Sequence, residues 1–157
     1  MLLKDLVDNK LTCYEQSFDD WKEAIKANGV PLKREGYIDD QYIGAVIACV
    51  EKYGPYIVIA PNIAMPHSTE GAPGVYKTGI GFMKTEEPVH FDPADPEKDA
   101  RLFFMLASND SDAHLNNMMQ LADMLSNDDL VADLLNAKND DDLLAIAEKY
   151  NEDNYEI

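Results

Sequence analysis

The sequence has few basic residues, only two cysteines and no long apolar run, and each shortage excludes a class of protein. Of its 157 residues, 13 are Lys or Arg and 30 are Asp or Glu, which gives a formal net charge of -17. This balance argues against a nucleic-acid partner, whose phosphates attract clusters of Lys and Arg, and against docking on anionic lipid. The apolar runs at residues 42–50 and 55–61 are far shorter than the roughly 20 residues that cross a bilayer. We therefore expect no direct membrane insertion.

The N-terminus and the cysteines both indicate a cytoplasmic chain. Lys4 and Asp5 lie where a signal peptide would need its apolar stretch. Cys13 and Cys49 form no CxxC pair, so we expect free thiols in a reducing compartment, with a structural disulfide as the less favoured alternative. Cys49 lies inside the apolar stretch YIGAVIACV and is interpreted as a small core residue.

The chain length and the hydrophobic pattern predict one α/β layered domain over residues 1–157. Apolar spacing predicts a helix over residues 15–28 that closes near Gly29, with Pro31 as a stop signal. A second helix is expected from residue 39 or 40 to residue 53. Short apolar runs predict strands at residues 56–60, 62–65, 77–83 and 101–107, and residues 86–98 are expected to form a surface loop.

The C-terminal third is predicted to be helical and strongly acidic. Helices are expected after residue 109, at residues 128–136 and at residues 140–150. The first is assigned one apolar face made of Leu115, Met118, Met119, Ala122 and Leu125. Residues 105–157 carry 13 acids and two lysines, which we interpret as a solvated outer face, with a docking surface for a basic partner as the alternative.

His67 is the first of three histidines and follows Pro66 at the end of an apolar run. This places a titratable ring at the rim of a rigid element, where functional groups are commonly held. Ser68 and Thr69 could donate hydrogen bonds to an anion beside the ring. The residues alone leave open that His67 is a surface or capping side chain.

His114 begins the first C-terminal helix. With Ser111 as the N-cap, His114 would take the third helical position, where the helix dipole favours anions and a neutral imidazole. This would suit a phosphate site, and a plain helix-cap histidine remains the alternative. His90 lies in the proline-rich acidic stretch and is interpreted as a surface residue.

Several catalytic and binding motifs are missing. No predicted helix carries an HxxxH or HxxE spacing for a metal, and the sequence has no GxSxG elbow, no Walker loop and no GxGxxG. We therefore predict no metal and no nucleotide cofactor.

The segment Tyr53 to His67, YGPYIVIAPNIAMPH, resembles the active-site stretch of enzyme IIA proteins of the bacterial phosphotransferase system (PTS). The branch is the fructose/mannitol-type family, and the wording YGPYIVIAP is most similar to its L-ascorbate-type members. The resemblance continues to His114, which follows His67 by 47 residues, and covers nearly the whole chain.

The resemblance implies a phosphocarrier built on a mixed β-sheet flanked by helices on both sides. In the family, the histidine at the position of His67 accepts a phosphoryl group from HPr and passes it to a cysteine of enzyme IIB. His114 would be the second family histidine, and no cofactor is required. The alternative function is a stand-alone regulatory module that reports phosphorylation state to a transcriptional regulator. The oligomeric state does not follow from the sequence.

The chain departs from the family pattern at three places. Asn62 stands where glycine is common, so the turn there is expected to differ. Ser68 and Thr69 replace a common Arg-Pro pair after the histidine, and the upstream helix offers Glu51 and Lys52 where mannitol-type relatives have an arginine.

Overall fold

A five-stranded mixed sheet forms the centre of the protein. The computed structural model describes residues 2–151. The strands are β1 (Thr12–Glu15), β2 (Val58–Ala60), β3 (Asn62–Ala64), β4 (Gly79–His90) and β5 (Asp99–Ala107), in the spatial order β1-β4-β5-β3-β2. β1 runs parallel to β4 and β3 runs parallel to β5, whereas the β4–β5 and β2–β3 pairs are antiparallel.

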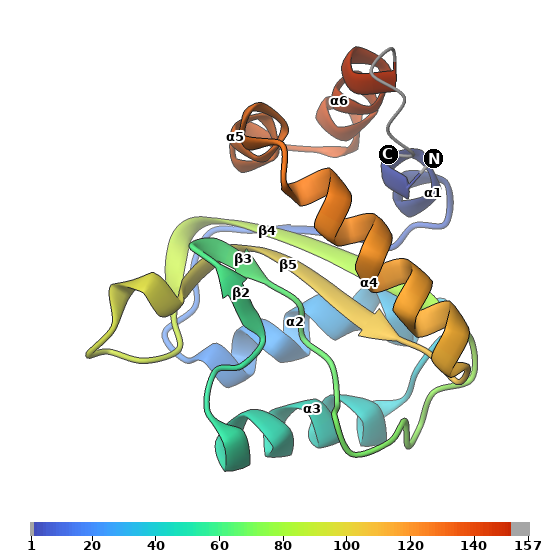
Figure 1. Cartoon of the computed structure of the whole chain (residues 1–157), viewed down its shortest axis with the longest axis vertical. Helices are drawn as coiled ribbons and strands as arrows, with labels where there is room; N and C mark the ends of the chain where they lie inside the picture. The colour runs from blue at the N-terminus through green and yellow to red at the C-terminus, as the bar shows by residue number, and fades with distance from the viewer. Residues whose placement is uncertain (1, 152–157) are drawn as a thin grey trace.

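Helices cover both faces of the sheet, as the family resemblance implies (Figure 1). One face carries α2 (Trp21–Arg34) and α3 (Asp40–Tyr53). The other carries α1 (Leu2–Asp8), α4 (Ser111–Leu125), α5 (Asp128–Asn136) and α6 (Asp140–Asn151). A 3₁₀ turn, Pro96–Lys98, lies in the connection between β4 and β5. In the described part of the chain, no helix is long and apolar enough to span a membrane.

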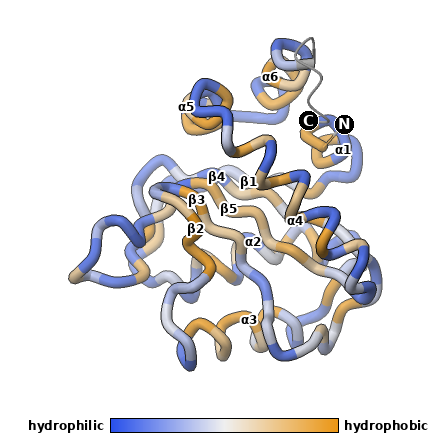
Figure 2. Tube along the Cα trace, in the orientation of Figure 1, coloured by the Kyte–Doolittle hydropathy of each residue, from blue (hydrophilic) through white to orange (hydrophobic). Residues whose placement is uncertain are grey.

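The core lies on the two longest strands. β5 is buried along most of its length and its neighbour β4 is buried over its first half, because helices cover both of their faces. Figure 2 shows the hydrophobic stretches in the sheet. Phe82, Phe103 and Phe104 are fully buried there, and Cys49 is also buried at 3% exposure. The prediction of Cys49 as a core residue is confirmed, and both cysteines are free thiols.

The prediction of the first long helix was wrong at both ends. α2 begins after its N-cap Asp20 and runs through Gly29 and Pro31 to Arg34, while residues 12–15 form β1. At Gly29, α3 packs closely against α2, since a Cβ there would lie 2.7 Å from Ile43 Cδ1. Burial of this helix against α3 and the sheet outweighs the local stop signals.

Other boundaries also differ from the predictions. β4 extends to His90, so Glu86 to His90 belongs to a strand and not to the expected loop; Val89 faces the core and is fully buried. The expected strand at 56–60 is the shorter edge strand β2, where Ile59 is 48% exposed. The strands at 62–65 and 101–107 and the helices at 39/40–53, 128–136 and 140–150 are confirmed within one or two residues.

The apolar face of α4 also differs from the prediction. Leu121, Met124 and Leu125 are buried, whereas Leu115 and Met119 are 56% and 62% exposed. Of the predicted face, Leu125 is buried and Met118 packs partly buried against the core, as expected. The packed face is therefore only partly the predicted one, and two large apolar side chains are left in solvent.

Asn62 begins β3 directly after the turn from β2. Asn62 has φ 71°, in the left-handed region that glycine adopts most readily and that asparagine tolerates best among other residues. Asparagine can therefore fill this position, and the expected difference from the turn of the family stays a prediction.

Parallel pairing of β3 and β5 positions the candidate site. Both strands end at the same edge of the sheet, so the residues that follow them meet there. His67 follows β3, and His114 follows β5 at the start of α4.

Candidate functional site

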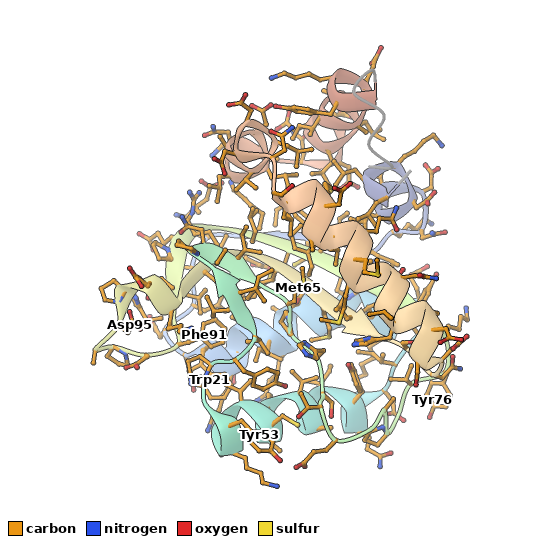
Figure 3. The ribbon with its side chains drawn as sticks, viewed as in Figure 1. Trp21, Tyr53, Met65, Tyr76, Phe91 and Asp95 are labelled. Atoms are coloured by element: carbon orange, nitrogen blue, oxygen red, sulfur yellow. The ribbon has the colours of Figure 1, made fainter. Side chains whose placement is uncertain are left out.

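Backbone hydrogen bonds hold the segment before His67 in the sheet. Leu106 N–H donates to the Pro66 carbonyl at 2.9 Å, and Met65 N–H donates to the Ile57 carbonyl at 2.8 Å. Met65 is 2% exposed (Figure 3 labels it). The strand-like backbone thus continues to the residue before the histidine, which makes the support of His67 rigid.

The ring of His67 is held in one tautomer. Its Nδ1 lies 2.6 Å from the Met65 carbonyl oxygen. Because a carbonyl oxygen only accepts, Nδ1 carries the proton and Nε2 keeps its lone pair. The Tyr56 ring packs edge-on against the imidazole, with 5.3 Å between ring centroids and an interplanar angle of 89°. The half-buried ring therefore offers Nε2 as a nucleophile.

His114 lies beside His67, with 5.8 Å between the ring centroids. Its place in the helix differs from the prediction, because the N-cap is Asp110 and not Ser111. His114 is therefore the fourth helical residue, and its N–H donates to the Asp110 carbonyl at 3.0 Å. Burial, and to a lesser extent the neighbouring His67, lowers the pKa of His114 from its ordinary 6.5. A neutral imidazole is thus favoured at neutral pH.

A polar pocket of about 310 Å³ lies next to the histidine pair. It is lined by three serines, by other polar and charged side chains and by two small residues: Ser68, Ser108, Ser111, Tyr42, Asn109, Asp110, His114, Gly71 and Ala72. None of the described residues that line it is Lys or Arg. The pocket can supply hydroxyl, amide and imidazole groups, with one carboxylate at its wall.

Both hydroxyl residues after His67 contact the Cys49 sulfur, but only Ser68 lines the pocket. Ser68 lines the pocket, and its Oγ accepts from the Glu70 N–H at 3.2 Å. Thr69 Oγ1 donates to Cys49 Sγ at 3.8 Å, and Ser68 Oγ lies 3.6 Å from the same sulfur. Burial acts to raise the pKa of the Cys49 thiol, but these hydrogen bonds outweigh it and the net direction is downward.

Two tyrosines contact the backbone after His67. Tyr56 Oη donates to the His67 carbonyl, and Ser68 N–H donates to Tyr42 Oη at 3.3 Å. The Tyr42 hydroxyl in turn donates to the Leu106 carbonyl on β5. Sequence reasoning missed both tyrosines because each lies in an apolar run that is typical of core residues.

Lys52 and Glu51, near the end of α3, form ion pairs outside the pocket. Lys52 Nζ lies 2.8 Å from Glu70 Oε1, and Tyr53 donates to the same carboxylate. Glu51 lies 3.5 Å from Lys22 Nζ. Lys52 therefore ties the loop after His67 to the end of α3.

His90 is exposed, as predicted, and lies at the far end of β4, where its Nδ1 is 2.9 Å from Asp99 Oδ1. Across residues 2–151, no three His, Cys, Asp or Glu side chains come together in an arrangement that could hold a metal ion.

Comparison with known proteins gives one consistent family. The profile of the phosphoenolpyruvate-dependent sugar phosphotransferase system, EIIA 2, matches residues 5–150. The chain is 32% identical over 146 residues to the mannitol-specific cryptic phosphotransferase enzyme IIA component of Escherichia coli, covering 93% of this chain and 97% of that protein. It is 31% identical over 137 residues to the ascorbate-specific PTS system EIIA component of Mycoplasma pneumoniae, covering 87% and 84%.

A solved complex has the same fold. The structure of enzyme IIAMTL with phosphorylated enzyme IIBMTL from Escherichia coli aligns with a TM-score of 0.76 at 25% identity, covering 89% of this chain and 95% of that one. Its polypeptide therefore follows nearly the whole path described above.

Proposed function

The chain belongs to the EIIA 2 family of the sugar phosphotransferase system, and from this premise we propose that it carries a phosphoryl group on His67. Proteins of this family are phosphotransferases that act through a histidine in sugar uptake. The proposal treats residues 1–157 as one EIIA domain in the cytoplasm. The observation that carries it is the fixed tautomer of His67, which leaves Nε2 free beside His114.

The proposed step is an in-line transfer between two nitrogens. The Nε2 lone pair of His67 attacks the phosphorus of phospho-HPr, an N–P bond forms, and the donor N–P bond breaks with its electron pair left on the donor nitrogen. The proton on Nδ1 stays in place, and the Met65 carbonyl stabilises the positive charge that develops on the ring. No step is assigned to a metal or cofactor.

His114, Ser68 and Thr69 are proposed to hold the transferred group. His114 and Ser68 both line the pocket beside His67, so their ring nitrogen and hydroxyl can donate to phosphoryl oxygens. The hydroxyls of Ser68 and Thr69 both lie against the Cys49 sulfur, so each would donate to the phosphoryl group only after it turns away from the sulfur. The negative charge of the phosphoryl group would raise the pKa of His114 and so favour its donating form.

The second step is proposed to deliver the group to enzyme IIB. A cysteine thiolate attacks the phosphorus, an S–P bond forms, and the electron pair of the broken N–P bond returns to Nε2. The relative solved with phosphorylated IIBMTL supports this partner. On the present chain, exposed Leu115 and Met119 follow His114 on α4, and Asp112 and Asp123 extend the same stripe of the helix. This stripe suits a partner with an apolar patch and a basic rim.

The sugar taken up by the system that this chain serves is proposed to be ascorbate-like. The motif YGPYIVIAP supports this choice, while the mannitol and ascorbate relatives have nearly equal identities of 32% and 31%. Uptake of labelled ascorbate and of labelled mannitol by a deletion strain carrying this chain separates the two. Restoration of mannitol uptake alone would contradict the choice.

The transfer itself is tested with HPr phosphorylated by labelled phosphate. Wild-type protein should take up the label in acid-labile form, His67→Ala should take up none, and His90→Ala should match wild type. Labelled His67→Ala would show that the site is wrong.

The docking stripe has its own test. The double variant Leu115→Ser, Met119→Ser should raise the KM for enzyme IIB about tenfold. The single-turnover rate of transfer at saturating enzyme IIB should stay unchanged. Leu144→Ser, which changes an exposed leucine of α6, is the matched control. An unchanged KM in the double variant would remove the stripe from the proposal.

A further inference from the structure

One peptide group next to His67 is held from both sides. The His67 carbonyl and the Ser68 N–H belong to the same planar peptide unit. Tyr56 Oη donates to the carbonyl, and Tyr42 Oη accepts from the N–H at 3.3 Å. Both polar atoms of that unit are therefore bonded to tyrosine hydroxyls and not to a strand partner.

The two tyrosines come from different parts of the fold. Tyr42 lies on α3, is 2% exposed, and donates its own proton to the Leu106 carbonyl of β5. Tyr56 lies just before β2 and is half-buried, with its ring edge-on to His67. Through these contacts, the peptide is tied at one side to the centre of the sheet and at the other to its edge.

The geometry of this peptide bears on the reaction. The Pro66–His67 peptide is held by the Leu106 N–H, so once the His67–Ser68 plane is held as well, the direction of the His67 Cα–Cβ bond is set. The Met65 carbonyl then fixes the ring rotation. In-line transfer depends on the aim of Nε2, and small misplacement of a reacting atom costs rate steeply. Neither hydroxyl has to touch the phosphoryl group to affect transfer.

We propose that Tyr42 and Tyr56 act together as a clamp on the His67–Ser68 peptide and are positioning residues for phosphoryl transfer. This inference rests on His67 being the acceptor. The clamp uses neutral hydroxyls, so it orients the histidine without adding charge beside the anion that the site receives.

The test is a double-mutant cycle with Tyr42→Phe, Tyr56→Phe and the double variant. Each single variant keeps its ring and should lower the single-turnover rate from phospho-HPr about tenfold, with the KM for phospho-HPr unchanged. Because both hydroxyls hold one peptide, the double variant should fall little further than either single variant. Rate losses that multiply to about a hundredfold would overturn the clamp, and so would a wild-type rate in Tyr56→Phe.

Amide hydrogen exchange at Ser68 gives a readout that does not depend on activity. Tyr56→Phe should speed exchange of the Ser68 N–H although Tyr56 does not contact it, because the whole peptide loosens. Tyr14→Phe, whose hydroxyl contacts Asp140, is the matched control and should leave exchange at Ser68 unchanged. Unchanged Ser68 exchange in Tyr56→Phe would overturn the proposal even if Tyr42→Phe does not fold.

Failure of the clamp and failure of the phosphocarrier function give different results. If the wild-type chain takes no label from phospho-HPr, the proposed function fails, while Ser68 exchange still tests the clamp. If wild type is labelled and Tyr42→Phe alone is slow, the Tyr42 hydroxyl contacts the phosphoryl group directly and the clamp is wrong.

Discussion

Tyrosine hydroxyls hold chain segments in several places of this molecule, and two of these regions use different chemistry. At the histidine end of the sheet, Tyr42 and Tyr56 bond to neutral backbone groups. Where α6 begins, Tyr14 Oη donates to the Asp140 carboxylate at 2.9 Å, and Thr12 Oγ1 donates to it at 2.7 Å. The first region contains the proposed phosphoryl acceptor, and the second contains no candidate site.

Charge is more abundant in the second region. The Lys84 side chain is 1% exposed and pairs with Glu86, which Lys138 also contacts at 2.8 Å. These bonds tie β4 to the connection between α5 and α6. A carboxylate anchor of this kind beside His67 would repel a phosphoryl group, whereas a hydroxyl anchor does not. The loop after His67 does carry the exposed Lys52–Glu70 ion pair, but the peptide of His67 itself is held by neutral hydroxyls.

The largest expected effect is a loss of thermal stability when the Lys84–Glu86 pair is broken. Glu86→Gln removes the countercharge of a buried ammonium group, and we expect the melting temperature to fall by roughly 5 to 10 °C, as for other buried pairs that lose one partner. Phosphoryl transfer at 25 °C should be unchanged. Thermal unfolding followed by circular dichroism measures the first, and the labelled-HPr assay measures the second.

Lys84→Met is the matched control, because it removes the buried charge and keeps most of the side-chain volume. Lys84→Met should lower the melting temperature less than Glu86→Gln does, since Glu86 still pairs with Lys138. Hydrogen bonds from Lys138 and Lys84 lower the pKa of Glu86 from 4.5 to about 2. Its stabilisation is therefore complete above pH 4.5 and is lost as the pH falls toward 2, and Glu86→Gln should flatten that part of the stability curve. A larger loss in Lys84→Met would contradict this account of the pair.

A smaller loss is expected from Tyr14→Phe. The variant removes one of the two hydroxyls on Asp140 and keeps the ring against Phe82, so the free energy of unfolding should fall by about 1 to 2 kcal/mol. Urea denaturation measures this change. Transfer from phospho-HPr should stay at the wild-type rate, in contrast to Tyr42→Phe. A lower transfer rate in Tyr14→Phe would show that a loss of stability anywhere in the fold slows transfer. The contrast between the two regions would then disappear.

Sequence reasoning recovered the elements whose local signals and tertiary packing agree. α3 has an aspartate N-cap and ends at Gly54, and β5 is a continuous apolar run, so both were predicted closely. The bounds of α2 were predicted wrongly, because Gly29 and Pro31 are typical helix stop signals. Only the contact with α3 explains why the helix continues through them. α1 and β1 are too short to show a clear period and were missed.

For the site, the sequence supplied the histidines but not what holds them. His67 and His114 were paired by family resemblance, and the structure brings their rings within 5.8 Å. The roles of Tyr42 and Tyr56 depend on which backbone atoms lie at the tips of their side chains. That is set by the packing of α3 and β2 on the sheet, and no local pattern encodes it.

The smallest effect concerns the pH response of His114. Burial, followed by the neighbouring His67, lowers the pKa of His114, so the unfolded chain binds its proton more readily than the folded one. The contribution of this residue to stability is therefore full above pH 6.5 and is lost as the pH falls below that value. His114→Gln should remove this slope, which unfolding at a series of pH values measures.

Phosphorylation should reverse the direction of this shift. A phosphoryl group on His67 places negative charge beside the His114 ring and raises its pKa, so NMR titration should find a higher pKa in the phosphorylated protein than in the free one. His67→Gln removes the lesser cause and should restore only part of the ordinary value, because burial remains. His90, exposed at the far end of β4, is the internal control. If the pKa of His114 does not change on phosphorylation, the His114 ring does not face the transferred phosphoryl group. The neutral contacts would then orient His67 alone, and the charge balance of the site would have to come from the partner proteins.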